Sequence, residues 1–141
     1  MTRILTPIIA PSIVSTVGMA KFFGASFAVQ MSLAPKSVTS PVAMGIAEHI
    51  GGIAPLTAVL VVTTGIIGAI VGGRIFTILG LTEDSSKGIA MGLTAHGIGT
   101  ARAFQISPEM GAFSGLAMAL STVVTIILMP FMLKLIDVFM R

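Results

Sequence analysis

The sequence predicts an all-α, multi-pass membrane protein with about five transmembrane segments, two of them discontinuous helices. Of its 141 residues, 55% are hydrophobic and only 9% are charged, whereas roughly 25% are charged in a soluble domain. The mean hydropathy is +1.06. Because so little polar surface cannot cover a water-exposed protein, lipid is the expected solvent. We expect residues 1–141 to form a single membrane domain.

Three segments are free of internal polar breaks. Residues 53–73 and 112–133 carry no charge and match the roughly 20 apolar residues that cross a bilayer as a helix. Helix-start signals accompany both, namely Pro55 and the Ser-Pro-Glu run at 107–109. The shorter run 4–20 contains two prolines, and we expect its helix to begin near one of them.

Two further apolar stretches, residues 22–50 and 88–106, hold polar groups in their middles. The first contains Pro35 and Pro41, and the second contains glycines beside hydroxyl groups. Such breaks free backbone N–H and C=O groups, which are tolerated at membrane depth only inside protein or beside a water-filled cavity. A single shift along the chain also superimposes the breaks, placing Ala34 on Ala95, Thr39 on Thr100 and Glu48 on Glu109. The sequence thus suggests a repeated unit with a candidate site in each copy.

Positive charge indicates whether these stretches cross the membrane or dip in and return, because it accumulates on the cytoplasmic side. If both cross, most basic residues share one side, namely Lys21, Arg74, Lys87, Lys134 and Arg141. If both re-enter, the basic residues divide about evenly and select no orientation. We therefore expect crossing and a cytoplasmic C-terminus, with re-entry as the alternative.

The first break offers Lys36 and the hydroxyls of Ser37, Thr39 and Ser40, and a new helix can begin at Pro41 with Ser40 as its cap. A helix N-terminus has unpaired N–H groups and a partial positive charge, so an anion is the matching ligand. Lys36 adds a full charge. We expect these polar residues to bind substrate.

The second break offers His96, Gly97, Gly99, Thr100 and Arg102. The glycines free backbone groups, and arginine can bind a carboxylate through two parallel hydrogen bonds. Cations inside apolar segments are functional candidates, because they are costly unless they face a partner or a cavity. The two breaks together predict a site for a small carboxylate anion.

Several of these residues also have plainer interpretations. Lys36 could reach a lipid headgroup or pair with Glu48, and Arg102 could lie at a membrane end and pair with Glu109. His96 could be a hydrogen-bonded packing residue, and because histidine ordinarily titrates near neutral pH it is also a candidate for proton coupling. Glu48 and Glu109 are further candidates, although both stand near predicted helix ends, where solvation at the interface would explain them.

Other functions are disfavoured. The basic residues are scattered and no cysteine is present, which argues against nucleic-acid binding and disulfides. Arg102 occupies the third glycine position of a dinucleotide motif, and His49 with His96 supplies too few ligands for zinc. We expect no metal, no cofactor and no enzyme activity. The close glycine pairs predict helix packing, namely Gly68/Gly72, Gly88/Gly92 and Gly111/Gly115.

Two ordered motifs resemble the LrgB/CidB family of membrane proteins. The first runs Pro-Lys-Ser-Val-Thr-Ser-Pro-Val-Ala-Met over residues 35–44, followed by Ile-Gly-Gly-Ile at 50–53. The second runs Ala-His-Gly-Ile-Gly-Thr-Ala-Arg over residues 95–102, followed by Gly-Ala-Phe-Ser at 111–114. The resemblance covers essentially the whole chain, which corresponds to the C-terminal portion of longer members, so their upstream helices are expected to be absent here.

The resemblance implies two functions. The family is described as holin-like or antiholin-like regulators of murein hydrolase export and cell lysis, usually beside a smaller LrgA/CidA-type membrane protein. Plastid relatives are glycolate/glycerate translocators, and bacterial members have been linked to pyruvate. The residues carried over from the matching motifs are Lys36, Ser37, Thr39, His96, Thr100 and Arg102.

Our leading hypothesis is therefore an inner-membrane carrier for small monocarboxylates, surrounded by lipid and forming a homo-oligomer. The competing hypothesis is a holin-type pore or lysis regulator that acts by oligomerising. The pore hypothesis predicts that the Gly68/Gly72 and Gly111/Gly115 surfaces lie between subunits.

Overall fold

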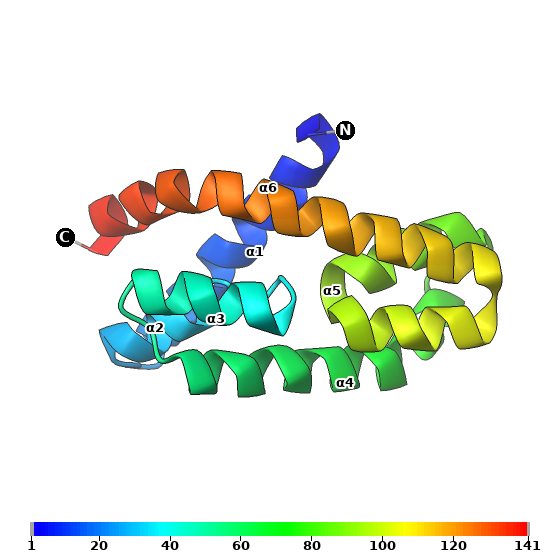
Figure 1. Ribbon diagram of the computed structural model, residues 1–141, viewed down its shortest axis with the longest axis horizontal. Coiled ribbons are helices and arrows are strands. Elements are labelled where there is room, and N and C mark those ends of the chain that lie inside the picture. Colours follow the sequence, from blue (N-terminus) through cyan, green and yellow to red (C-terminus); the bar gives the residue numbers. More distant parts are fainter. Residues whose placement is uncertain (1, 141) are drawn as a thin grey trace.

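The computed structural model describes the backbone of residues 2–140 and the side chains of residues 9–131 and Lys134. This part of the chain is all-helical and contains no strand. Figure 1 shows its helices in chain order, namely α1 (Thr2–Phe22), α2 (Phe27–Leu33), α3 (Ser40–His49), α4 (Ala54–Ile78), α5 (Asp84–Ile106) and α6 (Pro108–Met140).

The helix starts follow the local chemistry. Pro55 lies in the first turn of α4, and the Ser107 hydroxyl caps α6 by accepting from the Met110 N–H at 3.0 Å. Helix α3 begins at Ser40, with Thr39 as its N-cap residue. Helix α1 departs from expectation, because it begins at Thr2 and continues through both of its prolines. Proline has a helical φ, and a membrane helix tolerates the lost hydrogen bond.

Helix α5 is a hairpin of two half-helices. A straight helix of its 23 residues would be about 33 Å long, yet the Asp84 side chain lies beside Ser107 at the other end. A Cβ placed on Gly99 would lie 3.1 Å from the Met91 carbonyl oxygen. The backbone reverses at His96, where φ is 48° and ψ is −133°. The two halves lie side by side against α6 (Figure 1).

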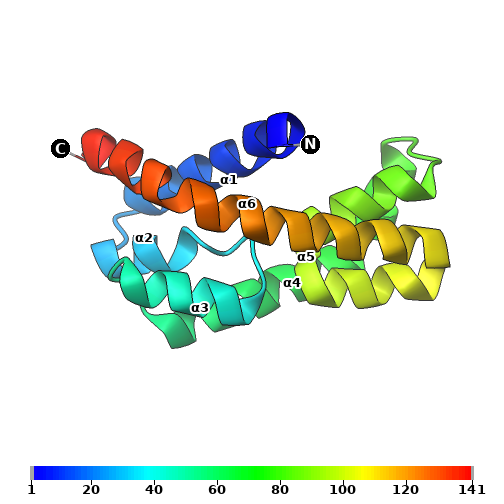
Figure 2. The same cartoon turned by 45° about the horizontal axis from the view of Figure 1, so that its top comes forward.

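Helices α2 and α3 also form a hairpin, which comes first along the chain, so α2–α3 is the first hairpin and α5 is the second. The Ile53 N–H, just before α4, donates to the Ser32 hydroxyl of α2 at 2.8 Å. A Cβ placed on Gly52 would lie 2.9 Å from the Met31 backbone. The chain thus returns after α3 to pack against the last turn of α2. The link between α2 and α3 points toward the middle of the molecule (Figure 2).

The two hairpins bear on the predicted topology. Both turn back within the array, which favours the re-entrant alternative, and α4 and residues 108–131 of α6 are the described segments long and apolar enough to cross a bilayer. Lys21 lies in the last turn of α1 and Arg74 lies late in α4, and the expectation that they share one side of the membrane stays a prediction. With re-entry, charge no longer selects a cytoplasmic C-terminus.

The order of a hairpin followed by a long helix occurs twice in the described chain. The first unit is α2–α3 with α4, and the second is α5 with α6. Helices α4 and α6 run in opposite directions (Figure 1). The second hairpin therefore starts from the end where α4 finishes, opposite to the first. This is an inverted arrangement of two similar units.

The outer surface is apolar along the long helices. Among the described residues, α4 and residues 108–131 of α6 are long and apolar enough to cross a bilayer, and α1 contributes a shorter apolar run at Ile9–Phe22. Valines and isoleucines of α4 such as Val59, Ile67 and Ile70 are more than half exposed. Such side chains face lipid in a membrane.

The glycine pairs pack within the chain. A Cβ at Gly68 would approach Ala95 at 2.6 Å, one at Gly72 would approach Met91 at 2.9 Å, and one at Gly111 would overlap Phe104. Packing by small residues is confirmed. The Gly68/Gly72 surface and Gly111 therefore face this chain's own helices, contrary to the subunit contact expected for a pore.

Candidate functional site

The tips of the two hairpins meet. His96 Nε2 lies 3.1 Å from the Lys36 carbonyl oxygen, and because a carbonyl can only accept, Nε2 is the donor. The Lys36 ammonium interacts electrostatically with the same ring. The two breaks in the sequence thus come together, sixty positions apart in the chain.

His96 combines burial with backbone strain. It is 3% exposed, and its φ of 48° makes it the non-glycine residue with positive φ among those described. Such a conformation costs of order 1–3 kcal/mol and persists only when its surroundings hold it. Nδ1 is buried and has no hydrogen-bond partner of normal geometry among the described residues, although the Gly92 carbonyl lies nearby.

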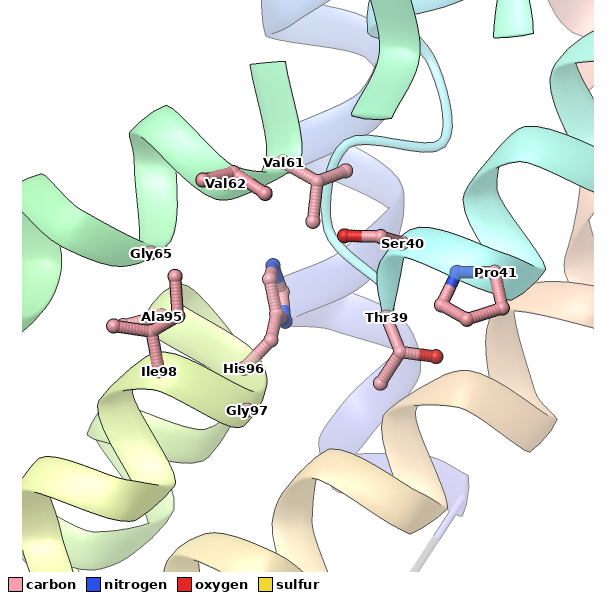
Figure 3. A pocket seen from close by; sticks show the side chains of 10 residues that line it. All are labelled: Thr39, Ser40, Pro41, Val61, Val62, Gly65, Ala95, His96, Gly97 and Ile98. Atoms are coloured by element: carbon pink, nitrogen blue, oxygen red, sulfur yellow. The ribbon is translucent and has the colours of Figure 1, made fainter. Parts of the chain in front are cut away.

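A cavity of about 240 Å³ lies where the tips meet α4. Figure 3 shows the imidazole projecting from α5 into the space between α3 and α4. The polar side chains of the lining are Thr39, Ser40 and His96. The remaining lining residues are apolar or glycine, namely Pro41, Val61, Val62, Gly65, Ala95, Gly97 and Ile98.

Two helix N-termini face this cavity. Helix α3 begins at Ser40, and the second half of α5 begins after His96; both starting points line the cavity. The first N–H groups of a helix have no partner within it and carry a partial positive charge. The site therefore offers backbone donors and positive potential without a lining cation.

The structure brings some of the predicted site residues together and separates others. Thr39, Ser40, His96 and Gly97 line the cavity, and Lys36 contributes its carbonyl. Ser37 faces α1, where its hydroxyl lies 3.3 Å from that of Ser12. Ser37 therefore holds the first tip against α1.

Gly99, Thr100 and Arg102 lie outside the cavity. Gly99 is packed against the first half of α5. The Thr100 hydroxyl bonds to that of Ser114 on α6 at 2.8 Å. Arg102 is exposed and donates to the Gln105 side chain at 3.0 Å. The expected cation pair is therefore not assembled, because Arg102 lies well beyond the tip on the returning half of α5.

The remaining titratable candidates are also elsewhere. Glu48 is exposed in the last turn of α3, and Glu109 is exposed in the first turn of α6. His49 is exposed, and its Nδ1 lies 2.7 Å from the Gly45 carbonyl of its own helix. The ionisable side chain that lines the cavity is His96.

Sequence reasoning missed the wall that α4 supplies. Val61, Val62 and Gly65 belong to an uncharged run of 25 helical residues, and nothing in their identities distinguishes them from lipid-facing neighbours. Their place at the cavity follows from the meeting of the hairpins. Gly65 shows the close approach, since a Cβ there would lie 3.1 Å from the Ala95 carbonyl oxygen.

Comparisons with known proteins identify the family of this chain. The family model described as the LrgB-like family matches residues 2–135. The uncharacterized protein YwbG of Bacillus subtilis is 35% identical over 123 residues, which are 87% of this chain and 55% of that protein. Holin-like protein CidB of Staphylococcus epidermidis is 33% identical over 115 residues, 82% of this chain and 50% of CidB. CidB of Staphylococcus aureus is 34% identical with the same coverage.

The chain spans about half the length of the curated relatives it matches. No solved structure matches it. The family match covers nearly every residue, and it agrees with the apolar α4 and α6. The chain is therefore a membrane protein that belongs to the LrgB-like family.

Proposed function

We propose that this chain carries the solute site of an inner-membrane carrier for small monocarboxylates such as glycolate, glycerate or pyruvate. The observation that carries the proposal is the meeting of two oppositely inserted hairpins at one cavity. Many secondary transporters are built from inverted repeats whose discontinuous helices bind the solute at the repeat interface. The proposal is that this chain transports the solute by itself, although the relatives it matches are longer proteins.

The charge of the site supports a monovalent anion. Each helix N-terminus is equivalent to roughly +0.5 elementary charge, so the two that face the cavity sum to about one. The Ser40 hydroxyl, which points into the cavity in Figure 3, can donate to a carboxylate, and Thr39 lines the same cavity. A second negative charge would find no lining cation and would carry the cost of burial without a partner.

His96 supports proton coupling at the same place. Its Nε2 is engaged by the Lys36 carbonyl, while Nδ1 has no partner of normal geometry among the described residues. A proton on Nδ1 could be donated to the nearby Gly92 carbonyl. His96 would then bind one proton together with one anion. Glu48 and Glu109 remain secondary candidates for proton transfer at the two ends.

Uptake by proteoliposomes tests the carrier. The full chain is reconstituted, and saturable uptake of labelled glycolate and pyruvate is measured. Removing two hydroxyls with the double variant Thr39→Val, Ser40→Ala is expected to lower uptake at limiting substrate at least about tenfold, because each bond to a charged group contributes about 1.5–3 kcal/mol. The matched control is Thr94→Val, whose exposed hydroxyl bonds only to the Ala90 carbonyl of its own helix. Unchanged uptake in the double variant would exclude this site.

A second candidate is a holin-like or antiholin-like regulator of murein hydrolase export, acting with a smaller LrgA/CidA-type partner. The printed names of the CidB relatives favour it. Its oligomer contacts would use surfaces other than the internally packed Gly68 and Gly72. Release of entrapped dyes of increasing size, without saturation, would support this candidate and contradict the carrier.

A further inference from the structure

The cavity has two chemically different walls. Thr39, Ser40 and His96 form the polar wall at the hairpin tips. Val61 and Val62 of α4, with Ile98 of α5, form an apolar wall. Figure 3 shows the two valines on the α4 side of the cavity, across from Ser40 and His96. A carboxylate bound at the polar wall therefore directs the rest of its body at hydrocarbon.

Val61 is the fixed part of the apolar wall. It is 4% exposed, whereas Val62 and Ile98 are about two-fifths exposed. Val61 belongs to a cluster with the fully buried Val38 and Ala43 at the first tip. Packing on this side leaves Val61 little freedom to move away from a solute.

The apolar wall discriminates between solutes of equal charge and length. Burying one methylene against it is favoured about fourfold over leaving it in water. A solute hydroxyl at the same place loses its water partners and gains none from valine or isoleucine, which disfavours it by roughly tenfold. Propionate and glycerate differ in this way, since both are three-carbon monoanions and glycerate adds two hydroxyls.

We infer that Val61 is a specificity-determining residue that, with Val62 and Ile98, makes the cavity prefer a carboxylate with an aliphatic body to a hydroxylated one. The inference rests on the proposed carrier function and narrows its substrate class. The inference concerns which monocarboxylate binds more tightly, whereas the proposed function concerns whether any is transported. An experiment can therefore contradict the inference without contradicting the proposed function.

Competition for uptake measures this preference. Because propionic acid crosses lipid unaided, the labelled solute is pyruvate, and unlabelled propionate or glycerate is the competitor. For the unmodified chain in proteoliposomes, propionate is expected to halve uptake at a concentration at least tenfold below that of glycerate. A ratio at or below one would overturn the inference.

The variant Val61→Thr replaces a methyl by a hydroxyl of similar size, and a helical threonine can bond to the preceding turn without leaving its hydroxyl unpaired. It is expected to reduce the propionate preference at least threefold. The matched control is Val59→Thr, the same change two positions away at a residue that is 62% exposed, and its ratio should not change.

The outcomes separate the two proposals. No saturable pyruvate uptake by the unmodified chain overturns the carrier function and the inference with it. If uptake is saturable but Val61→Thr and Val59→Thr prefer propionate over glycerate to the same extent, the inference about Val61 is overturned and the carrier function stands. If Val61→Thr transports too slowly to assay, binding is measured in detergent instead. The increase in Tm caused by propionate is compared with the increase caused by glycerate, which gives the preference without transport.

Discussion

The two hairpins reach the same cavity by different means. The first reverses over residues 34–39, the non-helical segment between α2 and α3, which contains the buried Pro35. The second reverses at one strained residue, His96. A longer turn spreads the change of direction over several ordinary conformations, whereas a single-residue turn concentrates it in one costly conformation.

The hairpins also differ in how tightly they are held. A Cβ on Gly88 or Gly92 of α5 would overlap the α6 backbone, whereas a Cβ on Gly45 of α3 would have no described atom within 4 Å outside its own helix. The second hairpin is clamped against α6, and the first is fixed mainly near Ser32 at its base. We expect the second to be the rigid part of the site and the first to be the part that moves.

The largest effect should come from filling these spaces. Gly92→Ala places a methyl group on the Ser114 carbonyl and should lower the free energy of unfolding by about 3 kcal/mol, the upper range for overpacking. Gly45→Ala meets open space and should be neutral or slightly stabilising, since alanine favours helix. Thermal unfolding in detergent measures both. Equal losses for the two variants would remove the distinction between the hairpins.

The single-residue turn is tested by two replacements of His96. His96→Gly loses the hydrogen bond to Lys36 but relieves the positive φ, whereas His96→Ala loses the bond and keeps the strain. His96→Ala is expected to be less stable than His96→Gly by about 1 kcal/mol. The comparison is made by denaturant unfolding in mixed micelles. If alanine were the more stable, the turn would not be strained.

The base of the first hairpin depends on one hydroxyl. Ser32 is fully buried, and it accepts from the Ile53 N–H at 2.8 Å and donates to the Ala28 carbonyl at 2.7 Å. Ser32→Ala leaves that N–H without its partner and should cost about 1–2 kcal/mol. Faster amide exchange at Ile53, with slow exchange retained in α5, would show that only the first hairpin has loosened. Uniform exchange would contradict the separate anchoring.

The smallest effect concerns the exposed base of the second hairpin. The Ser107 hydroxyl and Lys87 lower the pKa of Asp84, and the Lys87 ammonium lies 3.0 Å from its carboxylate. A lowered pKa means that Asp84 stabilises the fold above the ordinary aspartate value and ceases to do so as the pH falls through the lowered one. As the pH falls below the ordinary aspartate pKa of about 4, Tm should therefore fall slightly less in Asp84→Asn than in the unmodified chain. Parallel Tm curves would exclude this contribution.

The sequence predicted the helical class and the places where helices are interrupted, because prolines, glycines and hydroxyls mark them locally. For the two interrupted stretches it favoured crossing over re-entry, whereas both stretches turn back as hairpins. Both hairpins are specified by contacts between distant positions, such as Ile53 with Ser32 and Ser107 with Asp84. Charge counting favoured crossing because it treats every basic residue as the end of a span.

The sequence predicted the polar residues that line the candidate site but not the apolar residues of α4. Thr39, Ser40 and His96 stand out because polar groups in apolar runs need a reason. Arg102 stands out equally, yet its side chain is solvated beside Gln105. Val61 could not have been found, because its role comes from the tips that pack against it, and a valine in an apolar helix gives no local signal.

The shortness of α2 bears on how the chain is made. Its seven residues extend about 10 Å as a helix, too little to be recognised as a span when they leave the ribosome. The segment anchoring them, at Ile53 and the start of α4, is synthesised later. We therefore expect the first hairpin to enter the lipid together with α4, so that insertion of this chain does not proceed strictly one helix at a time.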